Sequence, residues 1–195
     1  MLFEQEHIPL PGGGLDYYPS YINEPEQLLT ELRDQMEWQQ PELQVYGRRH
    51  PSPRLVSFVG DPGISYHYSS FCHQANAWPA ALQGLRRRIE TDTGYRFNCG
   101  LLNYYRDGRD CMGYHSDDEP ALGSSPCVAS VSLGEVRDFC FKPKSGGKAQ
   151  KIALASGSLL LMLPPTQEHW LHALPARKTQ SGGRINITFR HIINI

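Results

Sequence analysis

Residues able to bind a transition metal occur in two separate parts of the sequence. His115 and Asp117 lie two positions apart, and on an extended chain residues at this spacing project to the same side. A second histidine, either His169 or His172, would complete a set of two imidazoles and one carboxylate. Such a set occupies one face of an octahedral Fe(II) ion and leaves the other positions open for a co-substrate and O₂. Because His-x-Asp triplets are common by chance, this site needs support from elsewhere in the chain.

A second group of polar residues alternates strictly with apolar ones in segment 184–190, Arg-Ile-Asn-Ile-Thr-Phe-Arg. The polar face of the predicted strand carries Arg184, Asn186, Thr188 and Arg190. This pattern is typical of a half-buried strand with a solvated face. The alternative is a wall that binds a dicarboxylate, because guanidinium groups bind carboxylates through paired hydrogen bonds and stay charged when buried.

An amide and a phenol share one face of a further predicted strand. Asn103 and Tyr105 lie shortly before His115 in the sequence. Buried polar groups of this kind need hydrogen-bond partners, and a bound organic acid would supply them. Ordinary core packing is the alternative interpretation.

The elements that must position these residues indicate an α+β fold. Amphipathic periodicity predicts helices over 23–38 and 79–93, with Gly94 ending the second. Short β-rich segments separated by turn residues then predict strands over 97–105, 128–133, 138–142, 151–155, 158–163 and 184–192. This spacing favours an antiparallel jelly-roll core with both helices buttressing one sheet. We expect residues 1–22, rich in Gly, Pro and Tyr, to form an irregular arm before a single domain over 23–195.

Composition excludes several classes of protein. The chain has 195 residues and a formal net charge of −1, and its apolar runs are too short for a membrane-spanning helix. The N-terminal residues do not resemble an export signal, and the five cysteines form no CxxC pair. We therefore expect reduced thiols in the cytoplasm, or in the nucleus of a eukaryote, and no secretion. Any nucleic-acid-binding surface must be local.

The motifs taken together resemble the AlkB family of Fe(II)- and 2-oxoglutarate-dependent nucleic-acid dealkylases. The resemblance runs from about residue 45 to the C-terminus and rests on four motifs in order: Asn103-x-Tyr105, His115-x-Asp117, His172 and the segment 184–190. It is strongest to the branch that contains the vertebrate nuclear homologue acting on duplex DNA. The resemblance implies a double-stranded β-helix, which agrees with the predicted strands.

The resemblance also implies roles for individual residues in the catalytic half. His115, Asp117 and His172 would hold the iron. Arg184 would pair with the distal carboxylate of 2-oxoglutarate, assisted by Tyr105. The rest of the co-substrate site would comprise Asn103, Asn186, Thr188 and Arg190.

A nucleotide-recognition region is implied for residues 45–78. Within it, Tyr46 would fill the gap left by a flipped base, and the adjacent Gly47 and Arg48 would contact the backbone. A solvated hairpin is the alternative interpretation of this turn. The resemblance further assigns substrate contacts to Arg54, Tyr66, Tyr68 and Asp118.

The implied activity is oxidative demethylation of 1-methyladenine and 3-methylcytosine in DNA by base flipping, a direct reversal of alkylation damage. The enzyme would use Fe(II), 2-oxoglutarate and O₂ on single- or double-stranded DNA, with RNA as a further candidate, and would act as a monomer. Two alternatives stay open. One is an oxygenase of the same fold that acts on RNA, protein or a small molecule, and the other is a non-catalytic nucleic-acid-binding module.

Overall fold

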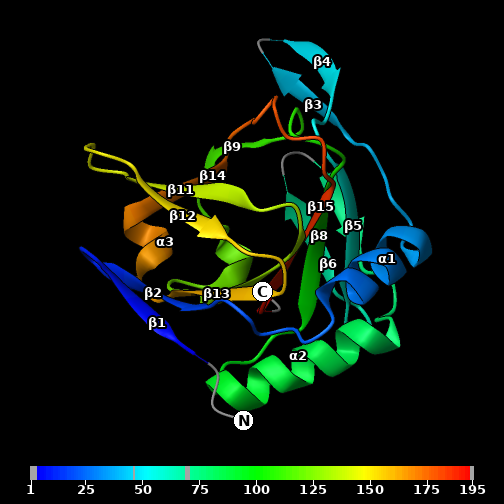
Figure 1. The fold of residues 1–195 in the computed structure, drawn as a ribbon, viewed down its shortest axis with the longest axis horizontal. Helices are drawn as coiled ribbons and strands as arrows, with labels where there is room; N and C mark the ends of the chain where they lie inside the picture. The colour runs from blue at the N-terminus through cyan, green and yellow to red at the C-terminus, as the bar shows by residue number, and fades with distance from the viewer. Residues whose placement is uncertain (1–3, 46, 69–70, 194–195) are drawn as a thin grey trace.

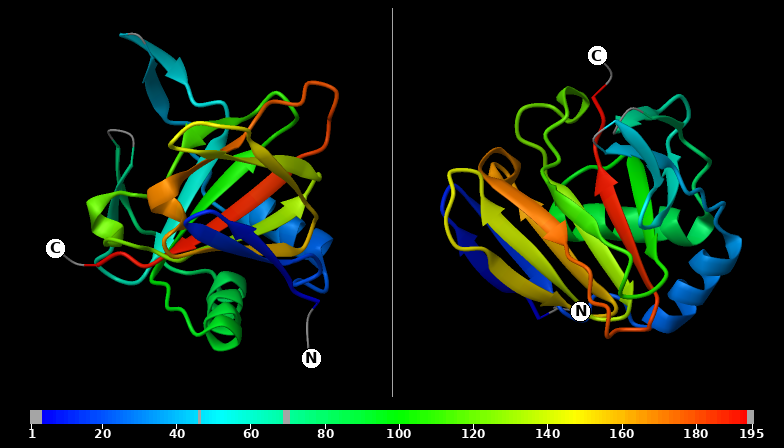
Figure 2. Two further views of the ribbon diagram at one scale, coloured as in Figure 1. Left: turned by 90° about the vertical axis from the view of Figure 1, so that its left-hand side faces the viewer. Right: turned by 90° about the horizontal axis from the view of Figure 1, so that it is seen from above.

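Two antiparallel sheets face each other and enclose the interior of the molecule (Figures 1 and 2). The computed structural model describes residues 4–45, 47–68 and 71–193. The seven-stranded sheet has the order β1 (Glu6–Leu10), β2 (Gly13–Tyr18), β13 (Ser158–Leu163), β10 (Val128–Gly134), β15 (Arg184–Arg190), β8 (Cys99–Tyr105) and β5 (Leu55–Gly60). The four-stranded sheet has the order β12 (Gln150–Leu154), β11 (Arg137–Pro143), β14 (Trp170–Leu174) and β9 (Met112–His115). This arrangement confirms the predicted jelly-roll core.

The seven-stranded sheet is apolar on its outer face because its strands alternate. Ile185, Ile187 and Phe189 of β15 are fully buried in the same cluster as residues from two helices. These helices, α1 (Pro25–Gln35) and α2 (Ala80–Thr93), lie on that outer face (Figure 2). Both were predicted. Gly94 ends α2 in the left-handed conformation at φ 78°, as glycine readily does. The polar residues of β15 consequently face the interior between the sheets.

The N-terminal prediction was wrong in one respect. Residues within 1–22 form strands β1 and β2 rather than an irregular arm; β2 pairs antiparallel with β13, and β1 is the edge strand of the large sheet. Leu10, Leu15 and Tyr17 are buried in a second core cluster between the sheets. Glycines and a proline obscured the alternation, and Gly12, at φ 70°, makes the turn between the two strands.

Two small hairpins stand beside the main sheets in the region predicted for nucleotide recognition. They are β3 (Glu42–Val45) with β4 (Arg48–Pro51), and β6 (Ser65–Tyr68) with β7 (Phe71–Gln74). The first projects from the top of the molecule in Figure 1. The remaining helical elements are α3 (Thr166–His169) and a 3₁₀ turn over Pro120–Leu122. In the described part of the chain, every helix falls short of the length and apolarity needed to cross a bilayer.

Candidate active site

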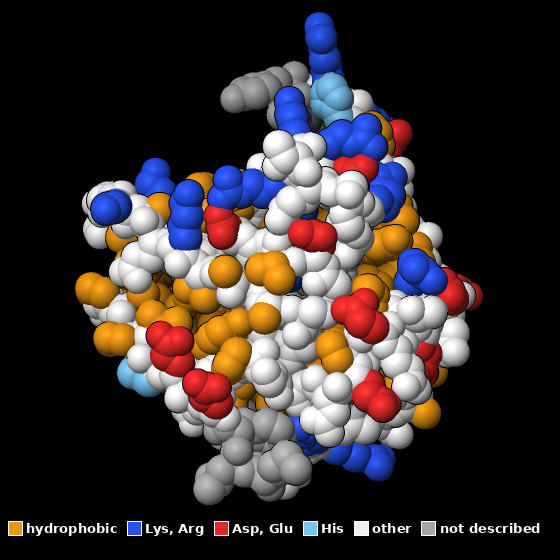
Figure 3. All heavy atoms as spheres, viewed as in Figure 1, with side chains coloured by type: hydrophobic (Ala, Val, Ile, Leu, Met, Phe, Trp, Pro, Cys, Tyr) orange, Lys and Arg blue, Asp and Glu red, His pale blue; other side chains and the backbone are white. Residues whose placement is uncertain are grey.

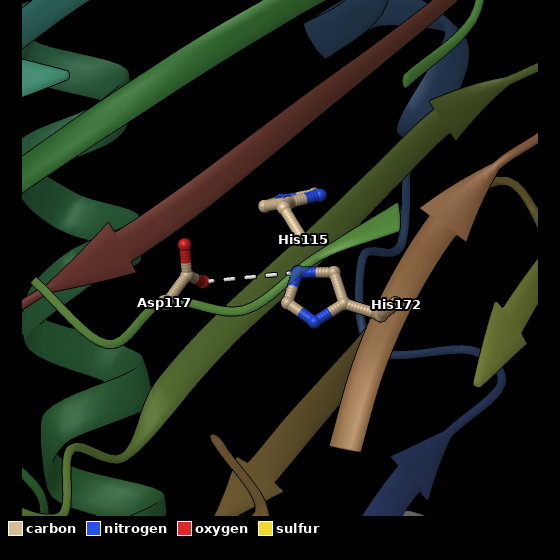
Figure 4. Close-up of side chains that lie close together, drawn as sticks. All are labelled: His115, Asp117 and His172. Atoms are coloured by element: carbon tan, nitrogen blue, oxygen red, sulfur yellow. Dashed lines mark ion pairs between the residues drawn. The ribbon is translucent and has the colours of Figure 1, made fainter. Parts of the chain in front are cut away.

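Two histidines from paired strands and one aspartate from the following loop converge in the interior (Figure 4). His115 ends β9 and lies directly opposite His172 of β14 in the sheet register. Their ring centroids are 4.2 Å apart. Asp117 follows His115 by two residues, and one potential ligand atom from each of the three lies within 4.8 Å of the others. The pairing of β9 with β14 therefore selects His172 over His169, which the sequence left open.

Both imidazoles are neutral at physiological pH. Burial, helped by the nearby His115, lowers the pKa of His172 to about 3. Burial also lowers the pKa of His115. The His115 Nδ1 lies 2.9 Å from the carbonyl oxygen of Gly113, and it donates its proton there as the neutral tautomer. The Nε2 lone pair of His115 is then available to a metal ion.

The Asp117 carboxylate is held rigidly although its side chain is completely buried. Its Oδ1 accepts a hydrogen bond of 2.7 Å from Arg190 Nη2. Burial alone would raise the pKa of Asp117, but the charge of Arg190 foremost among the neighbouring groups brings it down to about 2. Its Oδ2 lies 3.9 Å from His172 Nε2 and accepts no hydrogen bond from any residue that the structure describes. A buried anionic oxygen without a hydrogen-bond donor is costly, and a divalent transition metal bound by this oxygen and the two neutral imidazoles would neutralise it.

Polar side chains of β8 and β15 lie next to these three residues. We call this group the polar wall; its members are Asn103, Tyr105, Arg184, Asn186, Thr188 and Arg190. The register of β15 with β8 sets Asn186 opposite Asn103, and Arg184 opposite Tyr105. On the other side of β15, Ser130 of β10 lies opposite Thr188. One cavity is lined by the His–Asp–His cluster together with Leu101, Asn103, Tyr105, Met112, Ser130, Phe139, Met162, Asn186, Thr188 and Arg190.

Comparison with known proteins identifies the family. A family model described as the 2OG-Fe(II) oxygenase superfamily matches residues 14–190. The chain belongs to this superfamily. It is 38% identical to the protein named DNA oxidative demethylase ALKBH2 of Mus musculus, over 96% of this chain and 83% of that protein. It is 36% identical to alpha-ketoglutarate-dependent dioxygenase alkB homolog 3 of Rattus norvegicus, over 90% of this chain and 63% of that protein.

A solved structure supports the fold independently of these sequences. The structure of OsALKBH1 matches 95% of this chain and 100% of its own, with a TM-score of 0.62 at 16% identity. The family model and the sequence relatives, rather than this structure, show that the chain is an AlkB-type dioxygenase that uses Fe(II), 2-oxoglutarate and O₂. Both the family and the cofactors were expected from the motifs.

Arg184 could hold one end of 2-oxoglutarate in this dioxygenase. Its side chain is buried and its Nη2 donates to Ser132 Oγ at 2.7 Å. Its Nε has no hydrogen-bond acceptor among the described residues. Burial lowers the pKa of Arg184 to about 10, so the guanidinium stays charged at neutral pH. A buried cation with a spare donor fits an anionic carboxylate.

Sequence reasoning missed some residues of the site and misjudged the surroundings of another. Arg54, expected against DNA, is only 4% exposed, and its Nε donates to Asn103 Oδ1 at 2.7 Å. In this position it supports the polar wall instead of presenting a charge on the surface. Ser130, Phe139 and Met162 of the cavity were not predicted, although the alternation within each strand shows which residues share the inner face.

Three of the other residues predicted to contact the substrate are exposed, among those whose placement the structure describes. Gly47 and Arg48 are exposed at the turn of the β3–β4 hairpin. Asp118 is exposed, and its Oδ2 accepts hydrogen bonds from Lys144 Nζ at 2.9 Å and Ser116 Oγ at 2.8 Å. Tyr46 lies outside the described residues. Tyr66 and Tyr68 lie in β6, but their side chains are not among those described.

Proposed function

We propose that this dioxygenase demethylates 1-methyladenine and 3-methylcytosine in DNA and thereby reverses alkylation damage. The observation that carries the proposal is the His–Asp–His cluster, in which Asp117 and His172 are buried, beside the polar wall. The relative of this chain in Mus musculus is named a DNA oxidative demethylase, and its sequence aligns with 96% of this chain.

We assign the iron to the three converging side chains. His115, His172 and the Oδ2 of Asp117 would hold Fe(II), which with 2-oxoglutarate and O₂ supplies the oxidising power that hydroxylates the N-methyl carbon, later lost as formaldehyde. Arg190 keeps Asp117 ionised at neutral pH. The enclosing sheets bury Asp117 and His172, while His115 stays partly exposed.

The polar wall would bind the co-substrate. Arg184 would take the distal carboxylate of 2-oxoglutarate, with Tyr105 opposite it in the register. The other members of the co-substrate site would be Asn103, Asn186, Thr188 and Arg190. Each of these belongs to β8 or β15, so the central pair of strands sets the geometry of the whole co-substrate site.

Substrate recognition would depend on an extruded base. The methylated edge of adenine or cytosine is inaccessible inside a duplex, and loss of pairing lowers the cost of flipping it out. Methylation at these positions leaves a cationic base, and Asp118 would be its counter-charge. In the structure Lys144 forms an ion pair with this carboxylate, and the pair would have to break before the base could bind there. The stacking roles of Tyr66 and Tyr68 and the wedge role of Tyr46 stay predictions from the sequence.

Charge on the surface supports a nucleic-acid substrate. Lys and Arg side chains gather along the top of the molecule in Figure 3, around the β3–β4 hairpin and above the small sheet. Arg48 and Arg49 of that hairpin are exposed. The chain as a whole carries a formal charge of −1, so this concentration is local. Phosphates of a DNA strand would be attracted to that edge.

The test is turnover on defined oligonucleotides. The protein is loaded anaerobically with Fe(II) and 2-oxoglutarate, then given O₂ and oligonucleotides carrying 1-methyladenine or 3-methylcytosine, as single- and double-stranded DNA and as RNA. Mass spectrometry should show loss of the methyl group from DNA in the wild type but not in His115→Ala. Preferential loss from RNA would assign RNA as the substrate. Succinate formation with every oligonucleotide intact would favour a protein or small-molecule substrate, and oligonucleotide binding without any succinate would favour a non-catalytic module.

We also propose that the enzyme is a monomer of the cytoplasm, or of the nucleus in a eukaryote. Among the described residues, four cysteines are free thiols: Cys99, Cys111, Cys127 and Cys140. Free thiols support a reducing compartment.

A further inference from the structure

The backbone of the Asp117 metal ligand is held by a side chain from a distant element. Asp117 lies beyond the end of β9, so no strand ladder provides an acceptor for its buried N–H. Gln167 of α3 provides it instead: its Oε1 accepts from Asp117 N at 3.0 Å. Gln167 is 2% exposed, so water does not compete for this hydrogen bond.

Gln167 is itself fixed from two directions. Its Nε2 lies 3.3 Å from Met162 Sδ in the cavity wall. The preceding Thr166 both accepts from Gly14 N at 3.0 Å and donates to Gly14 O at 3.1 Å through its hydroxyl. A Cβ added to Gly13 would come within 2.5 Å of that hydroxyl oxygen, so the close approach of β2 to α3 requires glycine there. The short α3 is therefore docked firmly on β2.

We propose that Gln167 is a positioning residue that sets the Fe(II) affinity of the site. Arg190 fixes Oδ1 of the Asp117 carboxylate, and Gln167 fixes the backbone from which the side chain projects. The two contacts together leave Oδ2 directed at His172. Without the Gln167 acceptor, the buried N–H would need a new partner, and the loop would move to find one. The carboxylate would then no longer be oriented before the metal arrives.

The experiment measures binding of Mn(II), a redox-stable substitute for Fe(II), and does not depend on the nucleic-acid substrate. Gln167→Met keeps the length and volume of the side chain but removes the strong acceptor. Partners of metal ligands typically contribute about 10–100-fold to metal affinity, so we expect the Mn(II) dissociation constant to rise by about tenfold or more. We also expect 2-oxoglutarate turnover to recover when Fe(II) is raised to saturation. A purely structural role would lower the thermal midpoint of the metal-free protein and leave the dissociation constant unchanged, and that result would overturn the proposal.

Two further variants control the experiment. Gln40→Met removes another glutamine hydrogen bond, from Nε2 to Ser52 O, between two residues that do not line the cavity, and should leave the Mn(II) affinity unchanged. Gln167→Glu keeps an acceptor oxygen at the same position and loses the amide contact with Met162; burial beside the Asp117 carboxylate favours the neutral, protonated form of the new carboxyl group, so the substitution adds no charge to the site. It should bind Mn(II) nearly as tightly as the wild type. If Gln167→Met does not fold, the Mn(II) affinity of Gln167→Glu alone tests whether the acceptor oxygen sets the affinity. A Glu variant in which the affinity is lost would overturn the proposal.

Discussion

Removal of Arg190 should destabilise the metal-free protein strongly. The substitution Arg190→Met keeps an unbranched side chain but leaves the completely buried Asp117 carboxylate without its 2.7 Å ion pair. Breaking a buried pair from one side typically costs about 3–5 kcal/mol, since the remaining charge stays out of water. We expect a loss of about that size in the free energy of unfolding at pH 7, measured by denaturant titration in the presence of a chelator.

The pH dependence distinguishes this mechanism from a packing defect. In the wild type the pKa of Asp117 is lowered from 3.8 to about 2, so its contribution to stability is complete above pH 3.8 and disappears as the pH falls toward 2. In Arg190→Met, burial acts without its opposing cation and raises the pKa of Asp117 above its ordinary value. Protonation then stabilises the folded variant at low pH. The stability difference between the two proteins should therefore be large at pH 7 and much smaller near pH 3.

A double-mutant cycle supplies the decisive control. Asp117→Asn removes the charge that Arg190 neutralises, so adding Arg190→Met to it should cost much less than in the wild type. We expect a coupling free energy of about 2–3 kcal/mol between the two positions at pH 7. Additive effects, or a loss that is the same at pH 7 and pH 3, would refute the argument that Arg190 maintains the ionised metal ligand.

Three further substitutions test the co-substrate and nucleic-acid sites. Arg184→Met should raise the KM for 2-oxoglutarate by about 10–100-fold, because a charge-assisted hydrogen-bonded pair is lost; an unchanged KM would remove Arg184 from the co-substrate site. Lys144→Met leaves Asp118 with the hydrogen bond from Ser116, so kcat/KM should rise by about 2–5-fold on a methylated nucleoside and fall on an oligonucleotide, because the loss of a surface cation weakens the attraction of phosphates. Changes in the same direction on both substrates would contradict the competition between Lys144 and the cationic base. Tyr46→Ala should reduce demethylation of duplex DNA more than that of single strands, whereas equal reductions would exclude a wedge.

Periodicity was sufficient to predict the elements that carry the polar wall. Strict alternation in β15 separates Ile185 and Ile187, packed against the helices, from Arg184 and Asn186, which face the interior. The segment around Asn103 was predicted in the same way, and the pairing of Asn103 with Asn186 follows once these two strands are neighbours. Local alternation records which face of a strand is buried, so it also shows which residues share a site.

Long-range register could not be predicted by the same reasoning. The choice between His169 and His172 depends on the pairing of β9 with β14, and that pairing is irregular next to His172. The role of Gln167 depends on the docking of α3 against β2, which joins parts of the chain about 150 residues apart. Arg54 shows that the burial of a single charged residue cannot be predicted from the sequence around it. Nothing in its neighbours distinguishes an arginine on the surface from one buried against Asn103.

The most direct test of the account is anaerobic titration of the apoprotein with Fe(II) in the presence of 2-oxoglutarate. We predict one tight site per chain in the wild type, and its loss in each of His115→Ala, Asp117→Asn and His172→Ala while the fold is retained. One tight site that survives any of these substitutions unchanged would place the iron elsewhere and contradict the account.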